Sequence, residues 1–123
     1  MEREAKTILV VEDDSSMRLL CRVNLELEGF RVLEARTLDE ARRNLSSGTV
    51  DFVILDVHVG ADSGYDLIDT IRSDYPAPIA LITGSAEITA QDRERVDAVL
   101  PKPFEIAELT AAIHRLVGSH AES

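Results

Sequence analysis

Carboxylates follow or end two apolar, strand-like runs of this sequence. The run Thr7–Val11 is followed by Glu12 and Asp13, and the run Phe52–Leu55 ends in Asp56. An acidic residue disfavours strands and is costly to bury, so its place at the end of such a run indicates a site. For Asp56 taken alone, a turn residue at the start of a loop is the simpler interpretation.

Two further polar residues stand at the ends of later apolar runs. Thr83 ends the run that begins at Ile79, and Lys102 follows the run Ala98–Leu100. If the four runs are parallel strands, their carboxyl ends meet at one edge of a sheet, and the five polar residues converge there. Each residue has a simpler explanation alone, as a helix-start carboxylate, a strand threonine or a solvated lysine. Their joint placement at strand ends favours a site.

Three carboxylates at one point repel one another and raise their own pKa values unless a cation joins them. A hard divalent ion with oxygen ligands meets this need. Mg²⁺ suits a site that has few carboxylates and leaves room for phosphate oxygens. Zinc is disfavoured, because His58, His114 and His120 are scattered and Cys21 is the single cysteine of the chain.

A lysine ammonium and a threonine hydroxyl beside such a metal are the groups that hold an anionic phosphoryl oxygen. The whole set therefore predicts an aspartate nucleophile for phosphoryl transfer. In this interpretation Asp56 attacks, the metal offsets charge, and Lys102 and Thr83 hold the transferring group.

The elements that must position these residues alternate between strand and helix. The expected strands are Thr7–Val11, Phe30–Ala35, Phe52–Asp56, Ile79–Thr83 and Ala98–Leu100. The expected helices run from Asp14–Ser16 to Gly29, over Thr37–Leu45, from Tyr65 to before Pro76, over Ala86–Val96 and over Ile106–Val117. Such alternation predicts right-handed βαβ units, and so an α/β fold with a doubly wound five-stranded parallel sheet of order 2-1-3-4-5.

Two of these helices carry further expectations. The segment Ala86–Val96 has few large apolar residues, so we expect a marginally packed helix there. In the first helix, Leu19, Val23 and Leu27 form a second apolar stripe. We expect this stripe to pack on a neighbouring helix, with a partner surface as the alternative.

Length and charge limit the class of protein. At 123 residues the chain is expected to form a single domain, with a core over about residues 6–117 and a short tail at 118–123. The charged start Met1–Lys6 is not a signal peptide, and the single cysteine fits the cytoplasm. A net charge of −10 opposes binding to nucleic acid or to an anionic membrane, and it favours protein partners or divalent cations.

From Lys6 to about Val117 the chain resembles the receiver domain of two-component response regulators. The segments that carry the resemblance are Ile8–Asp14, Phe52–Asp56, Gly64, Leu81–Gly84 and Lys102–Phe104. It implies a flavodoxin-like (βα)5 fold and a phosphoacceptor of a two-component system or phosphorelay. It also implies that the protein is not an enzyme beyond its own phosphorylation and dephosphorylation.

The resemblance assigns roles to single residues. It implies that Glu12 and Asp13 bind Mg²⁺, with Asp13 as a direct ligand, and that the backbone carbonyl of His58 joins them. Asp56, also at the metal, would take its phosphoryl group from a histidine kinase or a histidine phosphotransfer protein. The phosphorylated state would change binding to a downstream protein target. The family's Lys-Pro peptide, here Lys102–Pro103, is commonly cis.

Several positions depart from the family pattern. Val59–Gly60 replaces the usual Met-Pro and Ser63 replaces a frequent Asp, so we expect a loop more mobile than usual. Val99 stands where many receivers have an aromatic switch residue, so an aromatic toggle cannot operate there. We expect instead that Thr83 and the Gly84–Ser85 turn move toward the phosphoryl group and shift the helix that follows.

Two other functional classes share parts of this pattern. A pseudo-receiver keeps the fold as a protein-binding module without phosphorylation, and the retained site residues argue against it. A Mg²⁺-dependent phosphohydrolase of the haloacid dehalogenase kind carries a second Asp two residues after the first, and here that position is His58. The imidazole of His58 either tunes hydrolysis by controlling water access or is an exposed loop group without a kinetic role.

Overall fold

The sheet that the sequence predicts is present in the computed structural model, which describes residues 5–84 and 88–121. Five parallel strands lie in the order β2 (Arg31–Ala35), β1 (Thr7–Val11), β3 (Phe52–Asp56), β6 (Ile79–Thr83) and β7 (Ala98–Pro101). Numbered within this sheet alone, the order is 2-1-3-4-5, so the predicted topology is confirmed.

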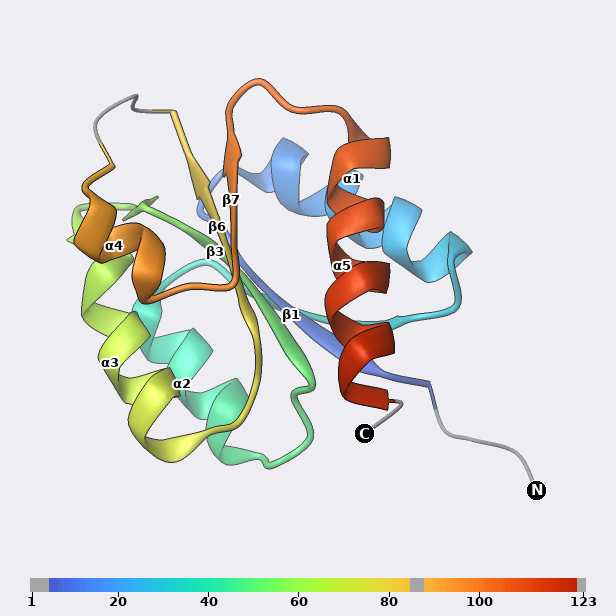
Figure 1. Cartoon of the computed structure of the whole chain (residues 1–123), viewed down its shortest axis with the longest axis horizontal. Coiled ribbons are helices and arrows are strands. Elements are labelled where there is room, and N and C mark those ends of the chain that lie inside the picture. The colour runs from blue at the N-terminus through green and yellow to red at the C-terminus, as the bar shows by residue number, and fades with distance from the viewer. Residues whose placement is uncertain (1–4, 85–87, 122–123) are drawn as a thin grey trace.

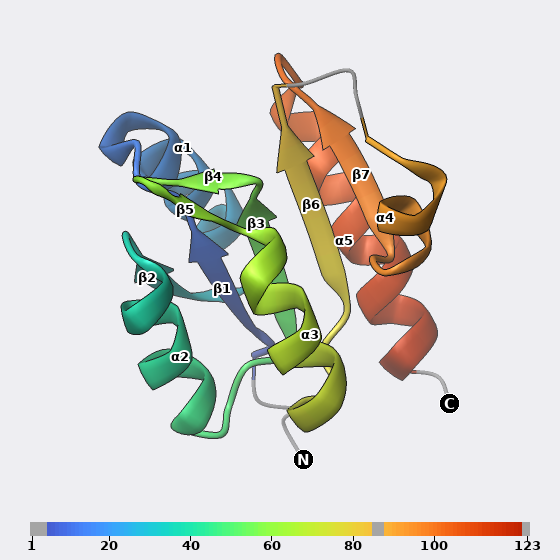
Figure 2. The ribbon, with the colours of Figure 1, turned by 90° about the vertical axis from the view of Figure 1, so that its left-hand side faces the viewer.

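Helices cover both faces of the sheet, which makes the fold doubly wound. One layer holds α1 (Ser15–Leu27) and α5 (Ile106–Ala121), and the other holds α2 (Leu38–Ser46), α3 (Tyr65–Asp74) and α4 (Ala90–Glu94) (Figures 1 and 2). Within the described residues, no helix is both long enough and apolar enough to span a membrane.

Each central strand contributes apolar side chains to both layers. In β1, Leu9 and Val11 belong to the core cluster under α2 and α3, whereas Ile8 and Val10 belong to the cluster under α1 and α5. All four are fully buried. Burial on both faces explains why these strands have no alternation of apolar and polar residues.

Local signals fix the helix ends that the sequence predicts. Asp14 caps α1 by accepting a hydrogen bond from the Ser16 amide, and Gly29, with φ of 94°, follows the helix. Thr37 caps α2 by accepting from the Glu40 amide at 3.1 Å. In a capping box the Glu40 carboxylate would accept from the Thr37 amide, but here it accepts from the Arg36 amide, one residue earlier.

The second apolar stripe of α1 does not pack on another helix. Leu19, Val23 and Leu27 are all exposed, with Leu27 at 80%. The expectation of helix packing was therefore wrong for these residues, because α5 covers the other side of α1, where Cys21 and Leu25 are buried. The alternative, that this exposed stripe binds a partner protein, stays a prediction.

Three other elements differ from their predicted form. The helix expected over Ala86–Val96 is limited to the five residues of α4, none of them buried, and residues 85–87 lie outside the described part of the chain. The helix expected to end at Val117 continues to Ala121, within the predicted tail. The loop expected to be mobile contains a small antiparallel pair, β4 (His58–Val59) and β5 (Asp62–Ser63).

Ion pairs connect α3 to the region around the short α4. Arg72 Nη2 lies 2.6 Å from Asp97 Oδ2, and Arg95 Nη2 lies 2.7 Å from Asp69 Oδ1. The same Asp97 oxygen accepts a hydrogen bond from the Ile79 amide at the start of β6. Asp97 therefore contacts both α3 and the start of a buried strand, whereas the exposed Asp69 pairs with the side chain of Arg95.

Replacing Asp97 by Ala should lower the free energy of unfolding by about 1–3 kcal/mol, because the Ile79 amide at the start of a buried strand loses its acceptor. Asp69→Ala is the matched control and should cost less than about 1 kcal/mol, as expected for an exposed ion pair. Urea unfolding of both variants measures the difference. Equal losses would contradict the assigned role of Asp97.

Candidate functional site

Strand register brings the acidic residues to one edge of the sheet. Val11 of β1 lies opposite Leu55 of β3, so Glu12 and Asp56 come next on adjacent strands. Asp56 in turn lies opposite Ile82 of β6. Residues far apart in the chain thus meet because parallel strands end at the same edge.

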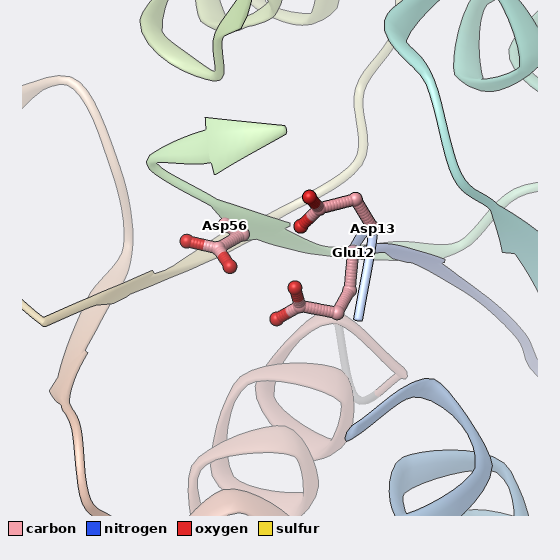
Figure 3. Close-up of side chains that lie close together, drawn as sticks. All are labelled: Glu12, Asp13 and Asp56. Atoms are coloured by element: carbon pink, nitrogen blue, oxygen red, sulfur yellow. The ribbon is translucent and has the colours of Figure 1, made fainter. Parts of the chain in front are cut away.

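The carboxylates of Glu12, Asp13 and Asp56 form a compact cluster at this edge. One oxygen from each lies within 4.8 Å of the others, and the side chains of Glu12 and Asp13 extend toward Asp56 (Figure 3). Glu12 is 2% exposed and Asp56 is 4% exposed, whereas Asp13 lies at the surface. The cluster is therefore buried on one side and open to solvent at Asp13.

Lys102, from the loop after β7, brings a positive charge to the two buried acids. Its Nζ lies 2.9 Å from Asp56 Oδ2 and 3.4 Å from Glu12 Oε1. The Lys102 amide donates to the Thr83 carbonyl at 2.7 Å, which ties this loop to the end of β6. The Lys102–Pro103 peptide bond is cis, as the resemblance implied.

Burial and charge shift the protonation of this cluster. Burial raises the pKa of Glu12 to about 7, and the hydrogen bond to Asp56 and the repulsion between the two acids add to this rise. The hydrogen bond from the Asp14 amide and the charge of Lys102 act in the opposite direction. Burial lowers the pKa of Lys102, but the contacts with Asp56 and Glu12 more than offset this, so the pKa of Lys102 is raised. The Lys102 ammonium therefore stays charged, whereas Glu12 holds its proton to a higher pH than an ordinary carboxyl group.

The other two predicted site residues, Thr83 and His58, lie near Asp56, Thr83 through the strand register and His58 along the chain. Thr83 ends β6 one residue beyond the partner of Asp56 and is 2% exposed. His58 has an exposed side chain, and its amide donates to Asp56 Oδ1 at 3.2 Å. This hydrogen bond fixes the second oxygen of Asp56, while Lys102 holds the first.

The donor set of the cluster suits a hard divalent cation. Three carboxylate oxygens within 4.8 Å match the oxygen ligands that Mg²⁺ binds, and none of the three residues is a soft ligand. Repulsion from Asp56 adds to burial in raising the pKa of Glu12. A bound dication would remove this repulsion.

One residue that contacts the cluster's backbone was missed in the sequence. Arg18, in the first turn of α1, donates from Nη1 to the carbonyl oxygens of Glu12 at 2.9 Å and Asp13 at 3.3 Å. An arginine near a helix start carries no motif by itself. Its partner Glu34 lies on β2, and only the folded chain brings the two together.

Comparison with known proteins agrees with this geometry. A family model described as the response regulator receiver domain matches residues 8–114. The chain belongs to the response regulator receiver domain family. Receiver domains are the phosphoacceptors of two-component signalling and are not classical enzymes, so the predicted class is confirmed.

Curated relatives of this receiver domain are longer proteins. Protein PetR of Rhodobacter capsulatus is 33% identical over 117 residues, covering 89% of this chain and 48% of the relative. KdpE, the KDP operon transcriptional regulatory protein of Escherichia coli, is 31% identical over 118 residues, covering 93% of this chain and 52% of the relative. The chain thus spans about half the length of these relatives.

Solved structures share the fold over nearly the whole receiver domain. Response regulator protein TrrA from Thermotoga maritima, solved in complex with Mg²⁺ and BeF, is 31% identical with a TM-score of 0.82, covering 90% of this chain and 98% of that one. A Burkholderia pseudomallei response regulator with a phosphorylated aspartic acid is 29% identical with a TM-score of 0.82, covering 95% of this chain and 71% of that one.

Gly64 allows the start of α3 to lie directly against the end of β3. A Cβ atom at this position would overlap the Asp56 carbonyl oxygen and crowd the carbonyl of Val57. The Gly64 amide donates to the Val57 carbonyl, and Val59 of the intervening hairpin is buried. A glycine is therefore required here for space, because the backbone that carries Asp56 is its nearest neighbour.

Gly64→Ala should lower the free energy of unfolding by about 1–3 kcal/mol, because the added methyl group must displace backbone at the end of β3. Gly84→Ala is the control, since a Cβ at Gly84 meets nothing within 4 Å, and its stability should stay within about 1 kcal/mol of wild type. Urea unfolding distinguishes the two. A Gly64→Ala protein as stable as Gly84→Ala would show that the contact is relieved at no cost.

Proposed function

We propose that Asp56 is the phosphoacceptor of this receiver domain and that Mg²⁺ is its cofactor. In this proposal Glu12, Asp13, Asp56 and the backbone carbonyl of His58 hold the metal. Lys102 and Thr83 hold the phosphoryl group. The phosphodonor is a histidine kinase or a histidine phosphotransfer protein, and the phosphorylated state changes binding to a downstream protein.

The observation that carries the proposal is the asymmetry at Asp56. Its Oδ2 is 2.9 Å from the Lys102 ammonium, while its Oδ1 accepts from the His58 amide at 3.2 Å. Both oxygens are thus oriented in a buried carboxylate beside two further acids. Such an arrangement supplies a positioned nucleophile, a cation site and a fixed positive charge, the components that phosphoryl transfer requires.

The chemistry follows from these positions. An oxygen of Asp56 attacks the phosphorus of a phosphohistidine, the P–N bond breaks, and the imidazole leaves with the bonding electrons and takes up a proton. The product is an acyl phosphate on Asp56. Bound Mg²⁺ offsets the charge of the phosphoryl oxygens. Lys102, released from Asp56, holds a phosphoryl oxygen instead.

Given Mg²⁺ and acetyl phosphate, the wild-type protein should gain the mass of one phosphoryl group, measured by intact-mass spectrometry. Asp56→Asn should gain none, because an amide is not a nucleophile for this step. Asp74→Asn, a change at the last residue of α3, is the control and should be phosphorylated like wild type. Equal labelling of Asp56→Asn, or no labelling of wild type with either a small donor or a cognate kinase, would refute the proposal and favour a phosphorylation-independent module.

Lys102→Ala should slow phosphorylation by about 100-fold or more, because the positive charge on the phosphoryl oxygens is lost. Mg²⁺ binding should persist, since removing an ammonium from beside Asp56 and Glu12 leaves them free to bind a dication. Lys6→Ala, which removes the other lysine just before β1, is the matched control. Loss of Mg²⁺ binding with phosphorylation intact would contradict the role given to Lys102.

A further inference from the structure

Arg18 links the metal-binding turn to the neighbouring strand through three hydrogen bonds. Its Nη1 donates to the carbonyl oxygens of Glu12 at 2.9 Å and Asp13 at 3.3 Å, and its Nε lies 3.1 Å from Glu34 Oε1 on β2. The Arg18 side chain is 12% exposed, so most of it is shielded from water. One guanidinium thus holds two successive carbonyls of the turn that carries two of the acids.

Glu34 in turn holds Arg18 in place. Its second oxygen, Oε2, accepts from Arg22 Nη1 at 2.8 Å, so the carboxylate lies between two arginines. Burial raises the pKa of Glu34, but the two arginines more than offset this and lower it, so Glu34 stays ionised at neutral pH. The strand backbone of Glu34 is fixed by pairing with Val10 of β1. Arg18 is therefore anchored to the sheet, not only to its own helix.

The two acids of the turn differ in what fixes their side chains. Glu12 is buried, and its oxygens contact Lys102 and the Asp14 amide. Asp13 is exposed, so packing does not fix its carboxylate. Its direction depends on the backbone of the turn, and Arg18 holds that backbone on both sides of the Asp13 Cα, through the Glu12 and Asp13 carbonyls.

We propose that Arg18 is a positioning residue for the Mg²⁺ site, which it serves by fixing the backbone that presents Asp13. This inference rests on the proposed Mg²⁺ site and adds a residue that is not itself a ligand. Groups that orient metal ligands in this way typically contribute a factor of about 10 to 100 in metal affinity.

The direction of the change in Mg²⁺ affinity distinguishes a positioning role for Arg18 from a purely electrostatic effect. A guanidinium near a cation site opposes cation binding, so removing its charge alone would tighten Mg²⁺ binding. A loss of the positioning effect would instead weaken it. Arg22 is the matched control, because it lies one turn later on α1 and its ion pairs are with Glu34 and Glu26.

The test is a Mg²⁺ titration of the full chain without phosphodonor, followed by amide shifts in ¹H–¹⁵N spectra, on wild type, Arg18→Met and Arg22→Met. We expect Arg18→Met to raise the Kd by about 10-fold or more and Arg22→Met to leave it unchanged or slightly lower. Methionine keeps much of the apolar stem but cannot donate to the carbonyls. A merely structural Arg18 would lower the unfolding midpoint and leave the Kd of the folded protein unchanged.

Each result is decisive. Wild type that binds no Mg²⁺ would overturn the proposed function and this inference together. Wild-type binding with an unchanged or tighter Kd for Arg18→Met would overturn this inference alone. If Arg18→Met does not fold, Arg18→Lys carries the same test, because its single ammonium keeps the charge but cannot reproduce the guanidinium fork. A Kd equal to wild type in Arg18→Lys would then overturn the inference.

Discussion

The site depends on one ammonium shared by two buried carboxylates. Lys102 contacts both Asp56 and Glu12 at an edge where Asp13 adds a third acid, so the cluster keeps an excess of negative charge. Burial of Glu12, together with its hydrogen bond to Asp56 and the repulsion between the two acids, raises the pKa of Glu12 to about 7. This excess of negative charge would attract a dication, and the bound dication together with Lys102 would then attract an anionic phosphoryl group. The charges of the cluster thus already match the ligands that we propose for this receiver domain.

The rest of the fold keeps these charges from relaxing apart. Glu12 and Asp56 extend from adjacent, fully buried strands whose register is fixed on both sides. Gly64 lets α3 begin against the Asp56 carbonyl, and Arg18 fixes the turn after β1. Among the helices of the described residues, α4 alone has no buried residue, and Arg95 just after it pairs with Asp69 of α3. A rigid site beside a weakly held helix is a suitable arrangement for a switch.

Sequence reasoning succeeded where one physical signal dominated. Apolar runs ending in polar residues gave the strands, their order and the convergence of Glu12, Asp56 and Lys102, because parallel topology leaves few alternatives. The sequence was insufficient where contacts between distant elements determine the local structure or the exposure of a side chain. The β4–β5 pair forms because Val59 is buried, the α1 stripe is exposed because α5 packs elsewhere, and the Arg18 contacts need β2 beside α1. Neither spacing nor propensity encodes such contacts.

The most direct test of the central claim is a crystal structure of this chain grown with Mg²⁺ and beryllofluoride, a mimic of the phosphoryl group. The account predicts the beryllium group on an oxygen of Asp56, with Lys102 turned from Asp56 to a fluoride. It also predicts one metal ion held by Glu12, Asp13, Asp56 and the His58 carbonyl. Beryllofluoride on another residue, or a metal ion away from the three acids, would contradict the account.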